Sequence, residues 1–208
     1  MLIPPKSTIV IQSFKGMVPV VHETAYVHPL ASVIGHVSVG ANCFIGAGAV
    51  LRGDWGKIIL EKGCNVQENA VIHMFPNTTV TLHEGAHIGH GAMVHGATIG
   101  EQCMIGMNAV VLDDVRLGKE SIVGALTLVK AQSVWEPRSL IVGNPGKCIG
   151  LVSDEMIAHK IEGTALYQRL PEEMHATSRI AEPMSAEPEN RIAQFPTFET
   201  WQARRKQK

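Results

Sequence analysis

Aromatic residues are scarce in this chain: they make up 5% of its 208 residues, although 45% of the residues are hydrophobic. A sizeable core must therefore be built from Val, Ile, Leu and Ala rather than from rings. No apolar run approaches the roughly 18 to 20 residues of a membrane-spanning helix. Residues 1–6 also lack the charged-then-apolar order of a signal peptide. We therefore expect a cytoplasmic protein that does not bind membranes.

Charge and cysteine patterning exclude further classes. The net charge is −1, and the basic cluster at residues 204–208 is terminal, so the sequence offers no electrostatic footprint for nucleic acid. The cysteines Cys43, Cys64, Cys103 and Cys148 are widely spaced and form no CxxC pair. We interpret them as small buried hydrophobic residues.

Aliphatic residues recur at every sixth position along most of the chain. A period near six fits neither an isolated helix nor an alternating strand, and it predicts an all-β solenoid of short stacked strands. If three hexads form one triangular coil, residues about 18 positions apart stack on one another, with coils about 4.8 Å apart. The repeat positions are Val27, Val33, Val39, Ile45, Leu51, Leu60, Val66, Ile72, Leu82, Ile88, Val94, Ile99, Ile105, Val111, Leu117, Val123 and Val129.

Two steps of the repeat are longer than six residues, and we interpret the extra residues, 53–55 and 74–77, as outward loops. Once these loops are set aside, the hexad phase places Arg52, His73 and His95 in one column. The two stacked histidines can then share a metal ion, since a zinc–nitrogen bond is about 2.0–2.1 Å long. The step after Val94 is one residue short, and the repeat does not explain it.

His90 has a different phase. The extended segment from His90 to His95 covers up to about 16 Å, less whatever the corner folds back, so we expect His90 to point from another face. An identical subunit across a threefold interface can bring it to a neighbour's histidine pair, as closed symmetry permits. The spacing therefore predicts a trimer.

The segments around these histidines resemble the metal motifs of γ-class carbonic anhydrases. They are residues 65–69, 71–73 and 88–96, and residues 51–54 resemble the arginine–aspartate motif of that family. The resemblance covers about residues 18–170 and is greatest to bacterial proteins of carnitine and phenylacetate catabolism. The histidine spacing combined with the Arg-Gly-Asp segment is specific, whereas many acyltransferases share the hexapeptide repeat.

This resemblance implies a left-handed parallel β-helix and a homotrimer with metal sites at the subunit interfaces. His73 and His95 would come from one subunit and His90 from its neighbour, with Zn²⁺, or Fe²⁺ or Co²⁺, as the ion. His83 and His87 match no ligand of the family, and we do not expect them to bind the metal.

Three neutral imidazoles leave Zn²⁺ with its full charge and an open position, which lowers the pKa of a bound water to about 7. The resulting hydroxide can attack carbon dioxide or a thioester carbonyl. Gln67 is expected either to orient this hydroxide or to form one rung of a polar ladder. Arg52 and Asp54 are expected either to wall the site and lock the trimer through a charge-assisted pair or to form a solvated ion pair.

Two loops depart from the family pattern. Its most active members carry a glutamate after the arginine–aspartate motif and another after the first histidine, where it acts as proton shuttle. Here Trp55 follows Asp54, and residues 74–78 contain no carboxylate. Proton transfer to buffer is therefore expected to be slow, with Glu68 and Glu84 as the substitutes nearest in sequence.

Three functions follow from these observations. The first is reversible hydration of carbon dioxide, a zinc-dependent lyase activity. The second is metal-dependent hydrolysis of acyl-coenzyme A thioesters, which needs no fast proton shuttle. The third is a non-catalytic accessory role in carnitine or phenylacetate coenzyme A metabolism. A hexapeptide acyltransferase is disfavoured, since that chemistry does not require three ligand-spaced histidines.

The repeat fades after Val134, and helical spacing begins at Ser153, a suitable N-cap, and is expected to stop at Pro171. Prolines and charged residues beyond that point predict a loosely ordered tail. The expected divisions are an N-terminal segment (1–17), a β-helix metal-binding domain (18–150), a helix (151–170) and a tail (171–208) anchored by Phe195, Phe198 and Trp201.

Overall fold

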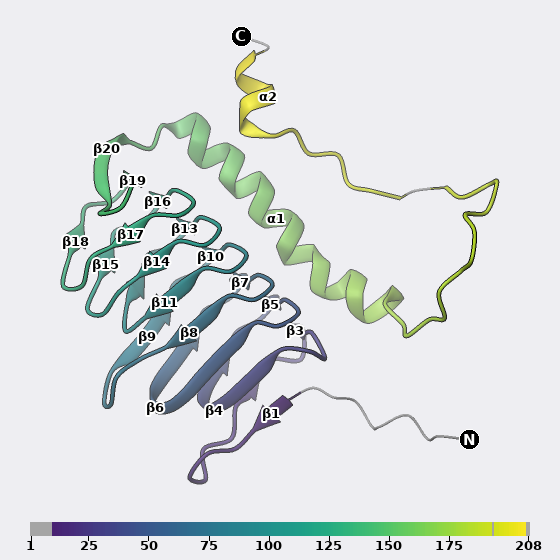
Figure 1. Ribbon diagram of the computed structural model, residues 1–208, viewed down its shortest axis with the longest axis horizontal. Coiled ribbons are helices and arrows are strands. Elements are labelled where there is room, and N and C mark those ends of the chain that lie inside the picture. Colours follow the sequence, from purple (N-terminus) through teal and green to yellow (C-terminus); the bar gives the residue numbers. More distant parts are fainter. Residues whose placement is uncertain (1–9, 193, 207–208) are drawn as a thin grey trace.

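The computed structural model of the chain describes residues 10–192 and 194–206. Short parallel strands wind into a triangular solenoid, and one long helix lies along one of its faces (Figure 1). This confirms the fold predicted from the repeat, a parallel β-helix of hexapeptides followed by a C-terminal helix.

Three stacks of strands form the faces of the solenoid, and β4 and β6 belong to two of them because each is long enough to turn a corner. Residues 53–55 lie within β6 instead of forming a separate loop. β6 accommodates three extra residues at a register shift, because Gly35 pairs with Gly53 and Val37 next pairs with Ile58. The first face consists of β1 (Val10–Gln12), β4 (Ser32–Val39), β6 (Val50–Leu60), β8 (Val71–His73), β11 (Met93–His95), β14 (Val110–Val111) and β17 (Leu128–Val129). The second consists of β2 (Val20–Val21), the later halves of β4 and β6, β9 (Thr79–Leu82), β12 (Thr98–Ile99), β15 (Arg116–Leu117) and β18 (Val134–Trp135). The third consists of β3 (Tyr26–Val27), β5 (Phe44–Ile45), β7 (Asn65–Val66), β10 (His87–Ile88), β13 (Met104–Ile105), β16 (Ile122–Val123), β19 (Ser139–Val142) and the antiparallel β20 (Lys147–Leu151).

The side chains of the hexad positions fill the axis of the solenoid. On the third face Ile45 pairs with Val66, Val66 with Ile88 and Ile88 with Ile105, and all four are fully buried. Burying one such side chain stabilises the fold by about 1.5–3 kcal/mol. The axial aliphatic stack is therefore the main source of stability.

Three of the four cysteines continue this core, as predicted. Cys43, Cys64 and Cys103 are buried free thiols at the corner that precedes the third face. Cys148 is exposed, contrary to prediction, because β20 lies outside the wound coils.

The short step after Val94 is a glycine corner. Gly96 adopts a φ of +60°, a conformation that side chains with a Cβ disfavour. A Cβ at Gly96 would lie 2.6 Å from Oδ1 of Asp113. The corner therefore saves one residue and lets the Asp113 carboxylate approach the coil closely.

The long helix α1 (Asp154–Thr177) packs along the third face (Figure 1). As predicted, Ser153 caps its start, with Oγ accepting from the Met156 backbone N–H at 3.2 Å. Lys160 fastens the helix to the solenoid by donating to the Gly85 carbonyl at 2.6 Å and to Gln102 Oε1 at 2.7 Å. Of the helices in the described ranges, none is both long and apolar enough to cross a membrane.

The helix does not end at Pro171, contrary to prediction. A proline inside a helix costs about 3 kcal/mol or more, because it removes one hydrogen bond and crowds the preceding turn. Here Pro171 is buried, and the turns beyond it make contacts that offset this cost. His175 donates to the Ala25 carbonyl at 3.0 Å, and its ring packs edge-on against Tyr26.

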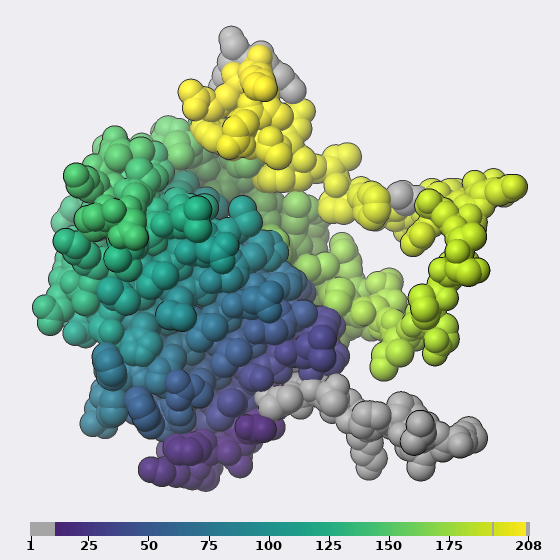
Figure 2. Space-filling model, viewed as in Figure 1, coloured from purple at the N-terminus to yellow at the C-terminus, as the bar shows by residue number. Residues whose placement is uncertain are grey.

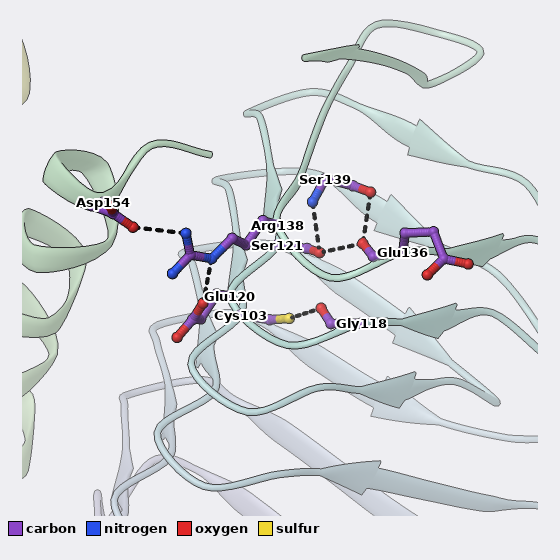
Figure 3. Close-up of polar contacts among 8 residues, drawn as sticks. All are labelled: Cys103, Gly118, Glu120, Ser121, Glu136, Arg138, Ser139 and Asp154. Atoms are coloured by element: carbon purple, nitrogen blue, oxygen red, sulfur yellow. Dashed lines mark hydrogen bonds and ion pairs between the residues drawn. The ribbon is translucent and has the colours of Figure 1, made fainter. Parts of the chain in front are cut away.

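Arg138 ties the start of α1 to the last coils (Figure 3). Its Nε donates to Glu120 at 2.8 Å and its Nη1 donates to Asp154 at 2.7 Å. In the same coils Ser121 Oγ accepts from the Ser139 backbone N–H at 3.1 Å. The C-terminal coils and the helix are thus joined by directed polar contacts as well as by packing.

The ends of the chain differ from the predicted divisions. β1 pairs with β4, so the solenoid begins before residue 18, while residues 1–9 lie outside the described ranges. The tail extends away from the body and returns at α2 (Trp201–Lys206) (Figure 2). Phe198 and Trp201 anchor it by packing on the ring of His159, as predicted. Phe195 is 84% exposed and is not an anchor, because it lies in the extended part.

Candidate metal centre

The predicted histidine column lies on the first face. β8 pairs with β11 so that His73 stands opposite His95, with ring centroids 5.2 Å apart. Leu51 stands opposite Ile72 one position earlier, which places Arg52 in the same stack. The hexad phase therefore identified residues that the fold brings together.

Each of the two rings has one nitrogen on a carboxylate. His73 Nε2 lies 2.9 Å from Oδ1 of Asp54, and His95 Nδ1 lies 2.6 Å from Oδ1 of Asp113. An ionised carboxylate only accepts, so in neutral rings these nitrogens carry the protons. The remaining nitrogens, His73 Nδ1 and His95 Nε2, then present lone pairs to each other across 3.2 Å.

Two lone pairs that face each other repel unless a proton or a metal ion lies between them, and the spacing fits a metal ion. Two nitrogens that each bind a tetrahedral zinc ion at about 2.0–2.1 Å lie about 3.3–3.4 Å apart. The observed 3.2 Å is close to this distance. Metal-binding histidines also usually donate their second N–H to a carboxylate, as both rings do here.

Asp54 joins the histidine column to Arg52. Arg52 Nη1 donates to Oδ2 of Asp54 at 2.6 Å, while Oδ1 accepts from His73. Burial raises the pKa of Asp54, but the hydrogen bonds from His73 and Arg52 outweigh it, so this pKa lies below its usual value. Asp54 is therefore ionised at neutral pH and orients the His73 ring, which a purely solvated ion pair would not do.

His90 lies apart from the column, as its phase predicted. It follows β10 on the third face, and its Nδ1 is 2.7 Å from Oε2 of Glu68. Within the described ranges of one chain, no three His, Cys, Asp or Glu side chains are placed to hold a metal ion. Glu84 pairs with Lys62 instead of approaching any of the three histidines.

Gln67 lies on the third face, in the wall of a cavity of about 300 Å³ that also includes His90. Its amide nitrogen contacts Asn65 Oδ1 at 3.1 Å and His87 Nε2 at 2.7 Å. Asn65 is fully buried, and its Nδ2 has no hydrogen-bond partner among the described residues. A buried donor left unsatisfied costs about 1–3 kcal/mol, and Asn65 is not among the residues that line this cavity.

Aromatic rings occupy the two segments that lack carboxylates. Trp55 packs on His73 with ring centroids 5.4 Å apart, and Phe75 packs on His95 at 5.0 Å. Both aromatic side chains are exposed. The histidine column therefore has an apolar rim where the most active relatives of the resembled family are expected to carry acids.

Sequence reasoning missed Asp113 and the contact of His87. Val94 pairs with Val111, so the hexad phase places Leu112 beside His95, and Asp113 approaches only through the short corner at Gly96. The contact of His87 could have been predicted from the repeat, because His87 stands opposite Asn65 on the third face and therefore lies close to Gln67.

Comparison with known proteins identifies the family. The protein-family model described as bacterial transferase hexapeptide (six repeats) matches residues 19–53 and 96–131 of the sequence. The carnitine operon protein CaiE of Escherichia coli is 42% identical over 179 residues, which cover 86% of this chain and 91% of that protein. A solved hexapeptide transferase family protein from Anaplasma phagocytophilum has a TM-score of 0.76 at 29% identity, covering 79% of this chain and 98% of that one.

A more distant structure shares the fold alone. AntD, an N-acyltransferase from Bacillus cereus, has a TM-score of 0.60 at 16% identity, covering 73% of this chain and 92% of that one. The architecture is thus one that acyltransferase enzymes also use. By its repeat, its fold and its identity to CaiE, the chain belongs to the hexapeptide-repeat family of CaiE-like proteins.

Proposed function

We propose that the protein is a trimeric metalloenzyme that hydrates carbon dioxide reversibly, with a divalent ion between subunits. His73 and His95 of one subunit and His90 of a neighbour would hold the ion, Zn²⁺ in the first place, with Fe²⁺ and Co²⁺ as alternatives. The observation that carries this proposal is the pair of ring nitrogens facing each other across 3.2 Å, each ring held by its own carboxylate.

The third histidine has the same kind of support, since Glu68 holds Nδ1 of His90 and leaves Nε2 for a ligand role. When bound, such an ion supplies a Lewis acid and a hydroxide nucleophile near neutral pH. Asp54, which contacts the ring of His73, would hold that ring in place, and Gln67, in the wall of the cavity that also includes His90, would orient the attacking water.

A second candidate function is hydrolysis of acyl-coenzyme A thioesters, and the apolar rim favours it. Trp55 and Phe75 offer ring surface to an acyl group, whereas carbon dioxide has no group that would use it. This reaction also tolerates the missing proton shuttle. The similarity to carnitine operon proteins supports a place in carnitine metabolism, whether as such an enzyme or as an accessory protein.

Metal content and two activity assays test these proposals. The full-length protein loaded with Zn²⁺, Fe²⁺ or Co²⁺ should bind one ion per subunit, and His73→Ala or His95→Ala should abolish binding, as elemental analysis would show. His83→Ala is the control, because His83 pairs with Glu61 away from the column and should keep the metal. Unchanged stoichiometry in both column variants would remove the assignment.

Carbon dioxide hydration and acyl-coenzyme A hydrolysis should be measured side by side on the same loaded protein. Zinc-dependent thioester cleavage without hydration would favour the second function over the first. Absence of both activities in a protein that still binds metal would favour the accessory role.

Mixed trimers test the sharing of the site between subunits. Inactive His90→Ala subunits combined with inactive His73→Ala subunits should regain metal at some interfaces, because one interface then draws all three histidines from intact partners. If no mixture regains metal, the three histidines do not act across an interface.

A further inference from the structure

His87 is a histidine that the proposed reaction does not use, yet its ring lies against Gln67. It belongs to β10 and stands opposite Asn65, which places the three side chains together on the third face. Tyr167 of α1 packs edge-on against the same ring, with centroids 5.4 Å apart. The ring therefore contacts both the helix and Gln67, and the side chains of His87, Gln67 and Tyr167 all line the cavity that includes His90.

The contact between His87 and Gln67 joins two nitrogens, so only one of them can be the donor. An amide nitrogen donates and cannot accept, so His87 Nε2 accepts with its lone pair, and the ring proton lies on Nδ1. The distance is 2.7 Å, and the second amide hydrogen of Gln67 goes to Asn65 Oδ1 at 3.1 Å. Both hydrogens are thereby used, and the carbonyl oxygen is the end of the amide that remains for a ligand.

The surroundings keep His87 neutral and able to accept. Burial lowers the pKa of His87 to about 3, and the positive charge of Lys160 acts in the same direction. Tyr167, the other titratable group against the ring, is a phenol whose pKa is raised by its own burial, so it stays neutral. A protonated imidazole would carry donors on both nitrogens and would oppose the amide nitrogen of Gln67.

We propose that His87 is a positioning residue that fixes the Gln67 amide so that its carbonyl oxygen, and not its NH₂ group, faces the reacting water. This inference rests on the proposed metal-dependent function, in which Gln67 orients that water. It requires no direct contact between His87 and substrate or metal.

The tautomer of His87 tests the proposal independently of any activity. Long-range ¹H–¹⁵N spectra of the full-length protein labelled with ¹⁵N-histidine should show His87 with its proton on Nδ1 and a bare Nε2. The signal is assigned by its loss in His87→Gln. A proton on Nε2, or a doubly protonated ring at pH 7, would overturn the proposal whatever reaction the protein catalyses.

Kinetics then test the consequence for the reaction. His87→Leu removes the acceptor and should lower kcat about 5- to 10-fold, as expected for the loss of one hydrogen bond, with KM and metal content unchanged. His87→Gln carries an acceptor at similar reach and should restore most of kcat. In a Gln67→Ala background His87→Leu should cause no further loss, because the two residues act as a unit.

A purely structural role for His87 predicts a different pattern. It would lower metal content and melting temperature together and would reduce kcat equally with or without Gln67, and either result would contradict the proposal. If neither reaction can be detected, the proposed function fails, and the spectra still decide whether His87 holds the amide.

Discussion

Asp113→Asn should weaken metal binding about tenfold. This substitution tests the candidate metal centre most directly, because it changes the carboxylate that contacts His95. Asn keeps the shape of Asp113 and can still accept from His95 Nδ1, but it lacks the charge that makes the ring a better ligand. Loss of such a supporting carboxylate typically costs 10- to 100-fold in metal affinity. The side chains of His95 and Asp113 are 21% and 26% exposed, so solvent screens the charge, and we expect a loss of affinity at the lower end of this range. Tenfold corresponds to about 1.4 kcal/mol.

Competition with a chromophoric zinc chelator measures this change on the full-length protein at fixed pH and ionic strength. The matched control is Asp114→Asn, which removes the same charge one residue away at a corner with a φ of +58°, a conformation that Asn accepts well. If Asp113→Asn binds zinc as tightly as Asp114→Asn, the carboxylate does not orient His95, and the fit of this column to a metal ion loses its main support.

Two further predictions concern proton transfer and pH. Carbon dioxide hydration should accelerate with imidazole buffer concentration. Phe75→Glu should weaken that dependence by placing an acid beside His95, whereas Phe75→Gln should not. Stopped-flow rates across a buffer series measure this, and equal slopes of rate against buffer concentration in the two variants would contradict the reasoning. Burial lowers the pKa of Lys160 from 10.5 to about 8, so between these values the unfolded chain binds more protons than the folded one, and stability should rise with pH. Lys160→Met should remove this rise, which amounts to at most about 3 kcal/mol. Urea unfolding of the wild-type protein and of Lys160→Met at pH 7.5 and 10.5 separates the effect of the lysine from that of the buried thiols, which both proteins contain. An identical change in the free energy of unfolding in the two proteins would contradict the prediction.

The hexad repeat was sufficient to place His73 opposite His95, although 22 residues separate them. Backbone pairing of parallel strands fixes the spacing between coils, so counting succeeds once the residues outside the repeat are recognised. It did not matter that residues 53–55 proved to be strand, because β6 still carries three extra residues after the pair Gly35–Gly53 and the count resumes beyond them.

Asp113 was beyond the reach of this counting. Its carboxylate meets His95 because Gly96 turns the corner one residue early, and the geometry of a corner depends on local φ and ψ values that a periodic pattern does not encode. The metal-supporting carboxylates are therefore visible only once the corners are built.

The helix boundary failed for a different reason. Pro171 is a valid local stop signal, but the contacts of His175 with Ala25 and Tyr26 join residues that are far apart in sequence. Tertiary packing outweighed a local rule at this position. The N-cap at Ser153 succeeded because capping is decided within one turn.

The position of the histidine column along the solenoid determines how strongly local unfolding affects it. Solenoids are quasi-one-dimensional, so thermal opening starts at the terminal coils and proceeds inward. β8 and β11 lie in the interior of their stack, with β6 and β4 on one side and β14 and β17 on the other. Amide hydrogens of β8 and β11 should consequently exchange with solvent more slowly than those of β1 or β17. The terminal coils can therefore unfold transiently while the coils that hold His73 and His95 stay folded and the two imidazole rings keep their separation.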